Sequence, residues 1–345
     1  MNVLSVLFSV LILCLIVTAH ELGHFLVGKA CGIGVIEFSV GFGPKILQWR
    51  GRETLYSIRC IPLGGYCRFV GEDGEDPAPN AMNNQPVWKR FLTVLAGPVM
   101  NFVLGTVLVV VLFLAFGLEY PVPVVGELVP GMPAETYGML PGDILVQVDG
   151  QPIENNEYGT GQATAALQNS DKSRPVEIVV LRDGEEVTLQ VPLQKNEDGS
   201  YQVGIYFDYD TIRYPLGKTL KLSMQTIRNE MGLMLSMLKN LIFRGEGVED
   251  VTGVVGVVSV MSQSMSSGLD SIIRLIIIIS FNLGIMNLLP IPALDGSRLV
   301  FLLVEGIRRK PIDREKEGMV HAIGLLILFG LMIVITYKDI VRLLK

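Results

Sequence analysis

The stretch Thr18-Ala19-His20-Glu21-Leu22-Gly23-His24 decides how the rest of this sequence is interpreted. It ends a run, residues 1–20, that has no charged side chain. Residues i and i+4 share a face of an α-helix, so His20 and His24 can offer two ring nitrogens to one zinc ion. Glu21 lies beside that face, where it could take a proton from a water at the metal. We therefore expect two metal ligands and one catalytic base here.

An accidental match is the first alternative, because H-E-x-x-H also occurs in ordinary surface helices. Two of the three histidines of the chain lie in this motif, however, and the preceding apolar run supplies no hydrated face. A soluble metalloprotease of the metzincin class would continue with Gly at position 27 and His at position 30. The sequence has Val27 and Ala30, which excludes that class. A third ligand must come from elsewhere.

Composition indicates a membrane protein, since 50% of the 345 residues are hydrophobic. About 20 apolar residues span a bilayer, and four uncharged stretches are long enough: 1–20, 91–118, 275–294 and 318–337. The first stretch lacks a basic leader and exceeds the apolar part of a signal peptide, so we interpret it as a retained span.

Basic residues are concentrated in regions 25–90 and 298–317, which should face the cytoplasm by the positive-inside rule. The N-terminus and region 119–270 would then lie outside, and Lys338, Arg342 and Lys345 are a mild counter-signal. The net charge of −6 argues against a nucleic-acid partner. The chain has four cysteines, Cys14, Cys31, Cys60 and Cys67, and they form no C-x-x-C pair. We expect them to be reduced and structural; metal binding by Cys60 and Cys67 is the alternative.

Residues 34–70 alternate in the manner of short strands, at 35–40, 45–49 and 54–59. Strand backbone at membrane depth must be paired or buried in protein. A small sheet beside the metal site is therefore expected, and a cytoplasmic hairpin without a catalytic part is the alternative. Residues 71–90 follow as a cytoplasmic loop, and Asn101, in the second span, offers an intramembrane hydrogen bond that we interpret as helix packing.

Residues 122–207 have the texture of a soluble, β-rich module, with strands expected at 176–181 and 187–193. The segment 130–150 resembles a PDZ domain of the bacterial, circularly permuted kind. Such domains bind a peptide or chain end by adding a strand to a sheet edge; the alternative is a module that only excludes large substrates. Residues 208–270 follow as an amphipathic helix, 215–243, and a connector rich in Gly, Val and Ser.

The third span ends in Asn287-Leu288-Leu289-Pro290-Ile291-Pro292-Ala293-Leu294-Asp295-Gly296, where two prolines break the helix. An aspartate at the end of an apolar run needs a partner. Together with His20 and His24 it would give three protein ligands and one open position, the pattern of a catalytic zinc site. A helix-terminal Asp295 exposed at the interface is the alternative.

These two motifs and the PDZ-like insert resemble the site-2 protease family of intramembrane zinc metalloproteases, in particular the bacterial regulator-of-sigma-E-protease type. The resemblance implies that His20, His24 and Asp295 bind zinc and that Glu21 is the general base. It also assigns substrate handling to three further residues: Asn287, Pro290 and Pro292. The chain departs from some relatives in having room for one PDZ domain, and from a family G-P-V-G segment in having Val254.

The expected fold class is a polytopic α-helical membrane protein, with about four transmembrane helices, a membrane-associated β-hairpin and an inserted extracytoplasmic PDZ-like α+β domain. The expected domain order is 1–33 (first span), 34–70 (strands), 71–90 (loop), 91–118 (second span), 122–207 (PDZ-like), 208–270 (helix and connector), 271–300 (third segment), 301–317 (cytoplasmic loop) and 318–345 (fourth span).

The function expected from this resemblance is zinc-dependent hydrolysis of peptide bonds within transmembrane segments in the bacterial inner membrane. The expected substrates are single-span proteins, such as anti-sigma factors or remnant signal peptides, already cut by an upstream site-1-type protease. A non-enzymatic peptide-binding scaffold is the main alternative, and the intact set of four site residues argues against it. A zinc transporter would need several ligand clusters, and His321 is the only spare histidine; we expect it to serve helix packing.

Overall fold

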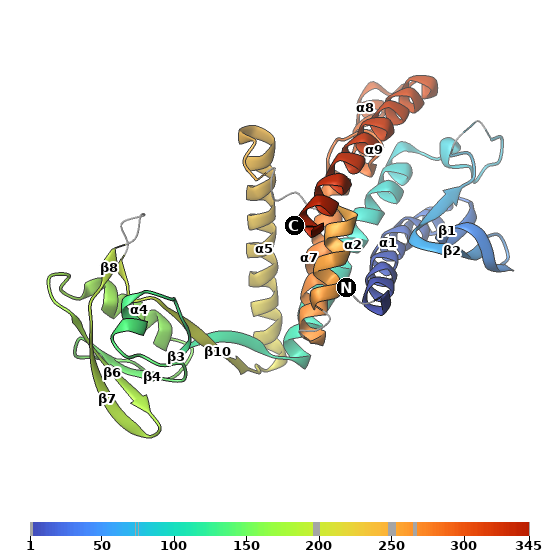
Figure 1. The fold of residues 1–345 in the computed structure, drawn as a ribbon. Helices are drawn as coiled ribbons and strands as arrows, with labels where there is room; N and C mark the ends of the chain where they lie inside the picture. The colour runs from blue at the N-terminus through green and yellow to red at the C-terminus, as the bar shows by residue number, and fades with distance from the viewer. Residues whose placement is uncertain are drawn as a thin grey trace. The chain divides into compact units, whose positions relative to one another are not determined.

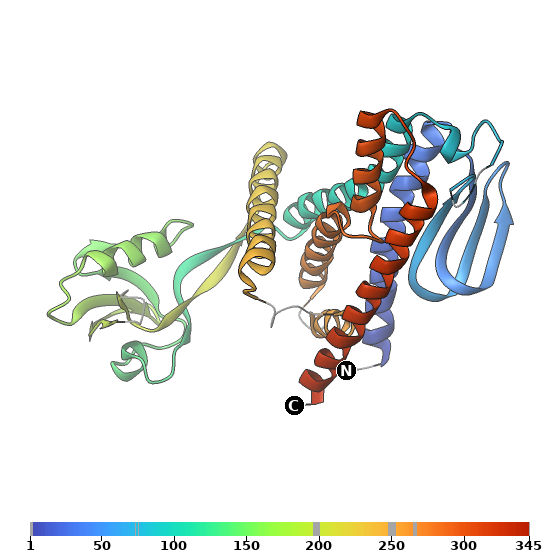
Figure 2. The same cartoon turned by 90° about the horizontal axis from the view of Figure 1, so that it is seen from above.

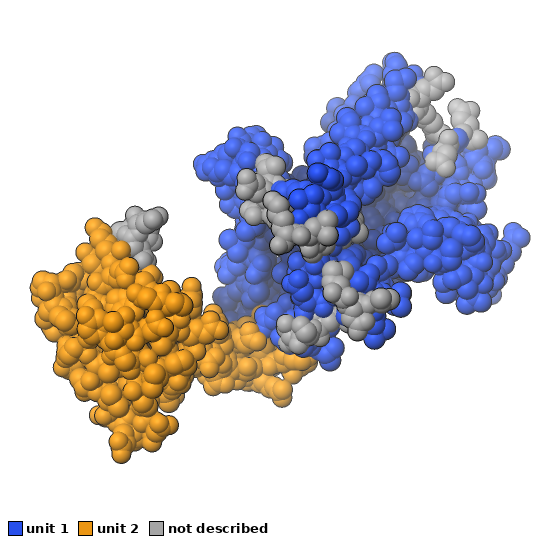
Figure 3. Space-filling view, viewed as in Figure 1, with its two compact units in different colours: residues 1–112, 217–345 blue, residues 113–216 orange. Residues whose placement is uncertain are grey.

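A computed structural model of the chain describes residues 3–72, 74, 76–195, 201–247, 253–264 and 268–344. It contains two compact units, unit 1 (residues 1–112 and 217–345) and unit 2 (residues 113–216), which Figure 3 colours separately. Four helices of the described chain are long and apolar enough to cross a membrane: α1 (Val3–Ala30), α2 (Val87–Ala115), α7 (Leu269–Leu288) and α9 (Arg314–Leu344). The prediction of four apolar spans is confirmed.

The helix ends differ from the predicted span ends. Helix α2 begins at Val87, before the apolar run that starts at residue 91, and stops at Ala115. Residue Leu118 already pairs with Ile212 in a β-ladder, so the prediction that the helix extends to 118 is wrong. An apolar run predicts only the part of a helix that lies in lipid. The hydrogen-bonded helix can begin or end several residues away from the ends of that run.

Two long strands, β1 (Val35–Arg50) and β2 (Leu55–Phe69), form the hairpin that follows α1. Residues 37–40 of β1 have 65–68 of β2 on one side and 55–58 of β2 on the other, and 45–50 pair with 55–59. The predicted separate strands at 35–40 and 45–49 are thus one continuous, irregular strand. Strand β2 packs against α1, and Figures 1 and 2 show the hairpin beside that helix.

A polar cluster lies inside the hairpin around Glu37, which is only 7% exposed. Burial opposes the charge of this carboxylate, but hydrogen bonds from Ser57 (2.7 Å) and Arg59 (2.8 Å) outweigh burial and lower the pKa of Glu37. Arg59 also donates to the hydroxyl of Tyr66 at 2.6 Å and to the carbonyl of Gly43 at 2.8 Å. Buried polar groups are costly unless they are bonded in this way. The cluster therefore fixes how the bent strands lie on one another.

The chain between the third and fourth spans differs most from expectation. Helix α7 ends at Leu288, and a second helix, α8, runs over Asp295–Arg308. The predicted segment 271–300 is thus two helices with a break. The predicted loop 301–317 is helical as far as Arg308 and again from Arg314, where α9 begins. The prolines stop α7, but Leu299 and Leu302 recur at helical spacing and are buried, which stabilises a new helix.

Two helices occupy the predicted segment 208–270. Helix α5 (Leu216–Arg244) matches the expected amphipathic helix. The predicted connector contains a helix that the prediction did not include, α6 (Val254–Ser264), whose Met261 is fully buried. Its small residues among valines let α6 pack closely on α1, α7 and α9. Residues 248–252, including Thr252 of the G-P-V-G-like segment, and 265–267 lie outside the described residues.

Unit 2 is built on a mixed-length antiparallel sheet with the strand order β10-β3-β4-β6-β7. Alternate residues of β6 point into one core, where Ile178 and Val180 are fully buried. Leu145 and Val148 of β4 reach the same core three residues apart, because the β4–β6 register shifts between Leu145 and Gln147. The elements are β3 (Leu118–Leu128), α3 (Pro133–Thr136), β4 (Ile144–Val148), β5 (Gln151–Pro152), α4 (Gly159–Asn169), β6 (Val176–Arg182), β7 (Glu185–Val191), β8 (Gln194–Lys195), β9 (Tyr201–Gln202) and β10 (Ile205–Ile212). Strands β6 and β7 occupy the two expected strand positions.

Candidate metal centre

The two histidines of the H-E-x-x-H motif lie on one face of α1 and are buried, with His20 6% and His24 8% exposed. Their Nε2 atoms are 3.1 Å apart. One helical turn separates the residues, and this spacing turns both rings to the same point. Two imidazole nitrogens thus meet within a membrane-spanning helix.

The carboxylate of Asp295 completes the cluster, although Asp295 lies 271 positions after His24 in the chain. Its Oδ2 atom lies 3.0 Å from Nε2 of His20 and 3.4 Å from Nε2 of His24. This Oδ2 atom is buried and has no hydrogen-bond partner among the described residues. A buried carboxylate oxygen without such a partner is costly, and a cation between it and the two rings would satisfy it.

A short, strained turn presents Asp295 at the first position of α8. Ala293 has φ +77°, which is unfavourable for a residue with a Cβ. Its N–H donates to Nδ1 of His321 on α9 at 3.1 Å. Gly296 follows, and a Cβ there would lie 2.1 Å from the carbonyl oxygen of Leu289. The turn is therefore held by α9 on one side and by close contact with the end of α7 on the other.

The donor set fits zinc. A tetrahedral site with ligand bonds of about 2.0–2.1 Å separates its donor atoms by about 3.3 Å, and the three contacts here measure 3.0, 3.1 and 3.4 Å. Gly97 on α2 leaves the space open: a Cβ at this position would lie 2.2 Å from Nε2 of His24 and 2.8 Å from Nε2 of His20. His20, His24 and Asp295 are the one group of potential metal-binding side chains found among the described residues.

Helix α2 also sets which ring nitrogens are free. Nδ1 of His24 lies 2.8 Å from the carbonyl of Thr93, so Nδ1–H donates and Nε2 keeps its lone pair for a metal. Nδ1 of His20 lies 3.1 Å from the amide nitrogen Nδ2 of Asn101, a fully buried residue. When the amide is turned with its oxygen toward Nδ1, it accepts the ring N–H, and an oxygen that otherwise has no partner is satisfied.

Glu21 lies at the edge of the same site. Its Oε2 accepts a hydrogen bond from the backbone N–H of Cys67 in β2 at 3.0 Å. Together with the two histidines and Asp295 it lines a cavity of about 360 Å³. The carboxylate is thus anchored through one oxygen and faces a space large enough for a segment of extended peptide.

The structure separates the three residues to which the resemblance assigns substrate handling. Asn287 lines the cavity that contains the histidines. Pro290 and Pro292 are absent from that lining, and Pro292 instead packs against Gly324 of α9. All four cysteines are free thiols. His321, expected to serve packing, in addition accepts the hydrogen bond from the Asp295 turn.

Three residues on α2 that touch the histidines were missed as site residues by sequence reasoning: Thr93, Gly97 and Asn101. The signal was present, because these positions are four residues apart and so share one face of the helix. That face matches the face of α1 on which His20 and His24 are also four residues apart. The spacing predicts that these three residues share one face of α2, but it does not predict which helix that face contacts.

Known proteins resemble this chain over almost its whole length. The model of peptidase family M50 matches residues 8–331. A protein from Clostridium acetobutylicum whose name describes a zinc metalloprotease is 33% identical, over 99% of this chain and 98% of its own length. A similarly named protein from Clostridium perfringens is 32% identical over 97% of this chain and 98% of its own. Zinc metalloprotease RasP from Bacillus licheniformis is 29% identical over 98% of this chain and 99% of its own.

Proposed function

Because the chain belongs to peptidase family M50, the site-2 proteases, and is therefore a membrane zinc metalloprotease, we propose that it hydrolyses peptide bonds inside the transmembrane segments of single-span proteins. The observation that supports this most directly is the convergence of two imidazoles and one carboxylate within 3.4 Å at a buried point of an apolar helix. An ionisable cluster at membrane depth is costly enough to make function its default explanation.

In this proposal His20, His24 and Asp295 hold the zinc ion, and Glu21 is the general base. A bound zinc ion polarises the scissile carbonyl as a Lewis acid. Glu21 accepts a proton from the attacking water through the oxygen that is not bonded to Cys67, and returns it to the leaving amide nitrogen. The Thr93 carbonyl, and the Asn101 amide once its oxygen is turned toward Nδ1 of His20, would hold the two rings in the tautomer that directs Nε2 toward the metal.

The hairpin supplies a way to hold the substrate. A transmembrane helix satisfies all its backbone groups internally, so it must unwind before a carbonyl can be attacked. Tyr66, Cys67 and Phe69 of β2 line the metal cavity, and pairing along this part of the hairpin would keep an unwound segment extended. Asn287 is well situated to bind its backbone, whereas Pro290 and Pro292 act by shaping the turn before Asp295.

Unit 2 would act as a PDZ-like module, within residues 122–207, that binds a peptide or chain end or excludes large substrates. It would restrict the enzyme to proteins already trimmed by an upstream protease, as in regulated intramembrane proteolysis of anti-sigma factors or remnant signal peptides. Deletion of 122–207 should then allow cleavage of an untrimmed substrate. If the deletion variant and the wild type cleaved that full-length substrate equally, this part of the proposal would be contradicted.

The proposed setting is the bacterial inner membrane, with the N-terminus and the PDZ-like module outside the cytoplasm. Basic residues between α1 and α2 and between α7 and α9 support this orientation. The metal cluster, near the end of α1, would then lie toward the cytoplasmic side. Reversed accessibility of cysteines introduced at these two basic regions would contradict the orientation.

The deciding experiment compares wild type with Glu21→Gln on a tagged single-span reporter in detergent, with zinc measured in both. Glutamine keeps an oxygen that can accept the Cys67 N–H, so the variant should retain its fold and its zinc. Loss of a general base typically lowers the rate by about 10²–10⁴-fold. A Glu21→Gln protein that cleaves at the wild-type rate would exclude Glu21 as the base, and wild-type protein that binds no zinc would exclude the proposed metal centre.

A further inference from the structure

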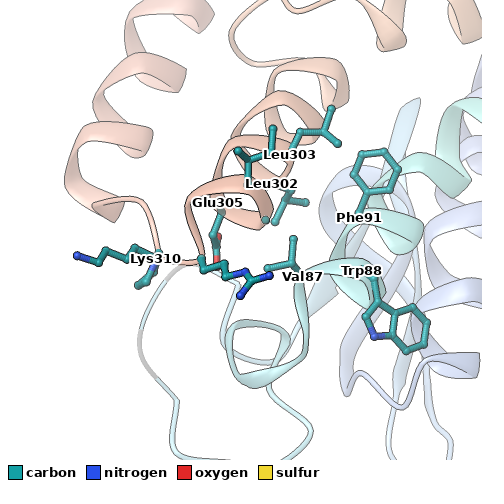
Figure 4. A pocket seen from close by; sticks show the side chains of 11 residues that line it. Val87, Trp88, Phe91, Leu302, Leu303, Glu305 and Lys310 are labelled. Atoms are coloured by element: carbon teal, nitrogen blue, oxygen red, sulfur yellow. The ribbon is translucent and has the colours of Figure 1, made fainter.

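A second cavity, of about 690 Å³, lies between the start of α2 and the end of α8, and it shares no lining residue with the metal cavity. Val87, Trp88 and Phe91 of α2 and Leu302 and Leu303 of α8 form its walls, as Figure 4 shows. Its volume is within the range of about 300–1,000 Å³ that is typical of small-ligand pockets. We refer to it below as the α2–α8 groove.

The rim of the α2–α8 groove is cationic. Its one acidic lining residue, Glu305, is neutralised by Arg90, which donates to both carboxylate oxygens. Arg309 and Lys310 also line the groove and are exposed. Among the described residues, no ion pair or hydrogen bond involves either of these two side chains. Two cations without a partner in the described part of the chain thus stand beside an apolar wall.

The α2–α8 groove also has the marks of a membrane interface. Trp88 is 58% exposed at the beginning of an apolar span, where indole rings favour the headgroup level. The ammonium of Lys89 lies 5.8 Å from the centre of its ring. Leu303 and Ile307 are 52% and 82% exposed, which is unfavourable in water and favourable against acyl chains.

We propose that the α2–α8 groove binds an anionic phospholipid. The apolar walls would contact an acyl chain, and Arg309 and Lys310 would bind the headgroup phosphate. An arginine fork matches phosphate oxygens, and a lysine adds a mobile point charge. The cationic group of a zwitterionic headgroup would be repelled by Arg309 and Lys310. The charge of the rim therefore favours a lipid with net negative charge. Because α8 begins at Asp295, the bound lipid would also fix the far end of the helix that carries this carboxylate.

Tryptophan fluorescence offers a direct test, because the chain has only two tryptophans. Trp49 stacks on Tyr56 in the hairpin, so Trp49→Phe preserves an aromatic contact and leaves Trp88 as the single fluorophore. Purified Trp49→Phe protein would be titrated with phosphatidylglycerol or phosphatidylcholine, each carrying brominated acyl chains that quench indole fluorescence. We expect phosphatidylglycerol to quench Trp88 with an apparent affinity about 10–30-fold higher, since each basic side chain contributes about a factor of five.

The matched controls remove the same charge at two places. Arg309→Gln with Lys310→Gln should abolish the preference for phosphatidylglycerol. Lys221→Gln with Lys239→Gln, two exposed positions on α5, should leave it intact. All four side chains are exposed, so these variants should fold.

Several results would overturn the proposal. Equal quenching by the two lipids would mean that only bulk lipid reaches Trp88. A preference that persists in the Arg309→Gln, Lys310→Gln protein would mean that other cations bind the headgroup. A preference that disappears when inorganic phosphate is added would assign the rim to a soluble anion. Absence of quenching by either lipid would mean that the α2–α8 groove does not face acyl chains.

Discussion

Replacing Gly97 by alanine tests the metal centre with a single methyl group. The new Cβ would lie 2.2 Å from Nε2 of His24 and 2.8 Å from Nε2 of His20, whereas ordinary contacts begin at 3.4 Å. Helix α2 or the ring of His24 must therefore move by more than 1 Å. Metal–ligand distances tolerate only about 0.2 Å. We expect Gly97→Ala to lose zinc almost completely, because the methyl group would press on both nitrogens that would bind the ion.

The same substitution should affect folding much less than zinc binding. Overpacking a helix contact costs about 1–3 kcal/mol, and replacing glycine by alanine within a helix returns about 0.5–1 kcal/mol. The net loss is at most about 2.5 kcal/mol, less than the roughly 5–15 kcal/mol by which folded proteins are usually stable, so the variant should still fold. Loss of an interaction that merely orients a ligand already weakens metal binding by about 10–100-fold, and a methyl group among the donor atoms should exceed that.

The assay is zinc per chain in purified protein, measured by atomic emission before and after dialysis against a chelator, together with the unfolding temperature. Gly105→Ala is the matched control: it lies on the same helix, and its Cβ would press on Phe281 at 2.6 Å, away from both histidines. Gly105→Ala should lose stability and keep zinc. The reasoning is refuted if Gly97→Ala retains zinc as firmly as wild type, or if Gly105→Ala loses zinc to the same degree.

The remaining predictions concern groups that hold the site or the hairpin in place. Asn101→Ala removes the hydrogen-bond partner of His20 and should weaken zinc binding by about 10–100-fold, measured by competition with a chromogenic chelator; unchanged affinity would mean that the tautomer is set elsewhere. His321→Ala releases the N–H of Ala293, whose left-handed backbone costs about 1–3 kcal/mol, and should lower both zinc affinity and unfolding temperature. His321→Asn, which still offers an acceptor, should recover part of each, and equal damage in both variants would count against the hydrogen bond. The pKa of Glu37 is lowered in the folded protein. The Glu37 carboxylate therefore stabilises the hairpin fully above the ordinary pKa of 4.5, and this stabilisation is lost as the pH falls through the lower pKa of the folded state. Hydrogen exchange, corrected for intrinsic rates, should therefore show protection of residues 35–50 falling at acid pH in wild type and changing little with pH in Glu37→Gln.

Much of the architecture could be predicted because strong local signals fix it. Uncharged runs of membrane length predicted four spans, and the helical period of H-E-x-x-H predicted that His20 and His24 face one point. Asp295 could be connected to them across the whole insert because an aspartate after an apolar run needs a partner. These inferences depend on length, charge and spacing, which the sequence states directly.

The parts that could not be predicted depend on tertiary packing. Prolines correctly indicated that α7 ends, but nothing local shows that a new helix begins at Asp295, because its stability comes from burying Leu299 and Leu302. The hydrogen bond between Ala293 and His321 joins segments whose distance cannot be read from sequence. Asn101 was assigned to helix packing because its partner lies on another helix, 81 positions away.

The distance along the chain between the donors has a consequence for how the enzyme is made. His20, Glu21 and His24 enter the membrane with the first helix, whereas Asp295 follows the third, 271 positions after His24. At a synthesis rate of about 5–20 residues per second, this interval lasts roughly 15–50 s. On the proposed assignment, a nascent chain carries its base and two ligands through that time without the third. Proteolytic activity would then arise only when insertion is nearly finished, so truncated translation products would remain harmless to the other single-span proteins around them.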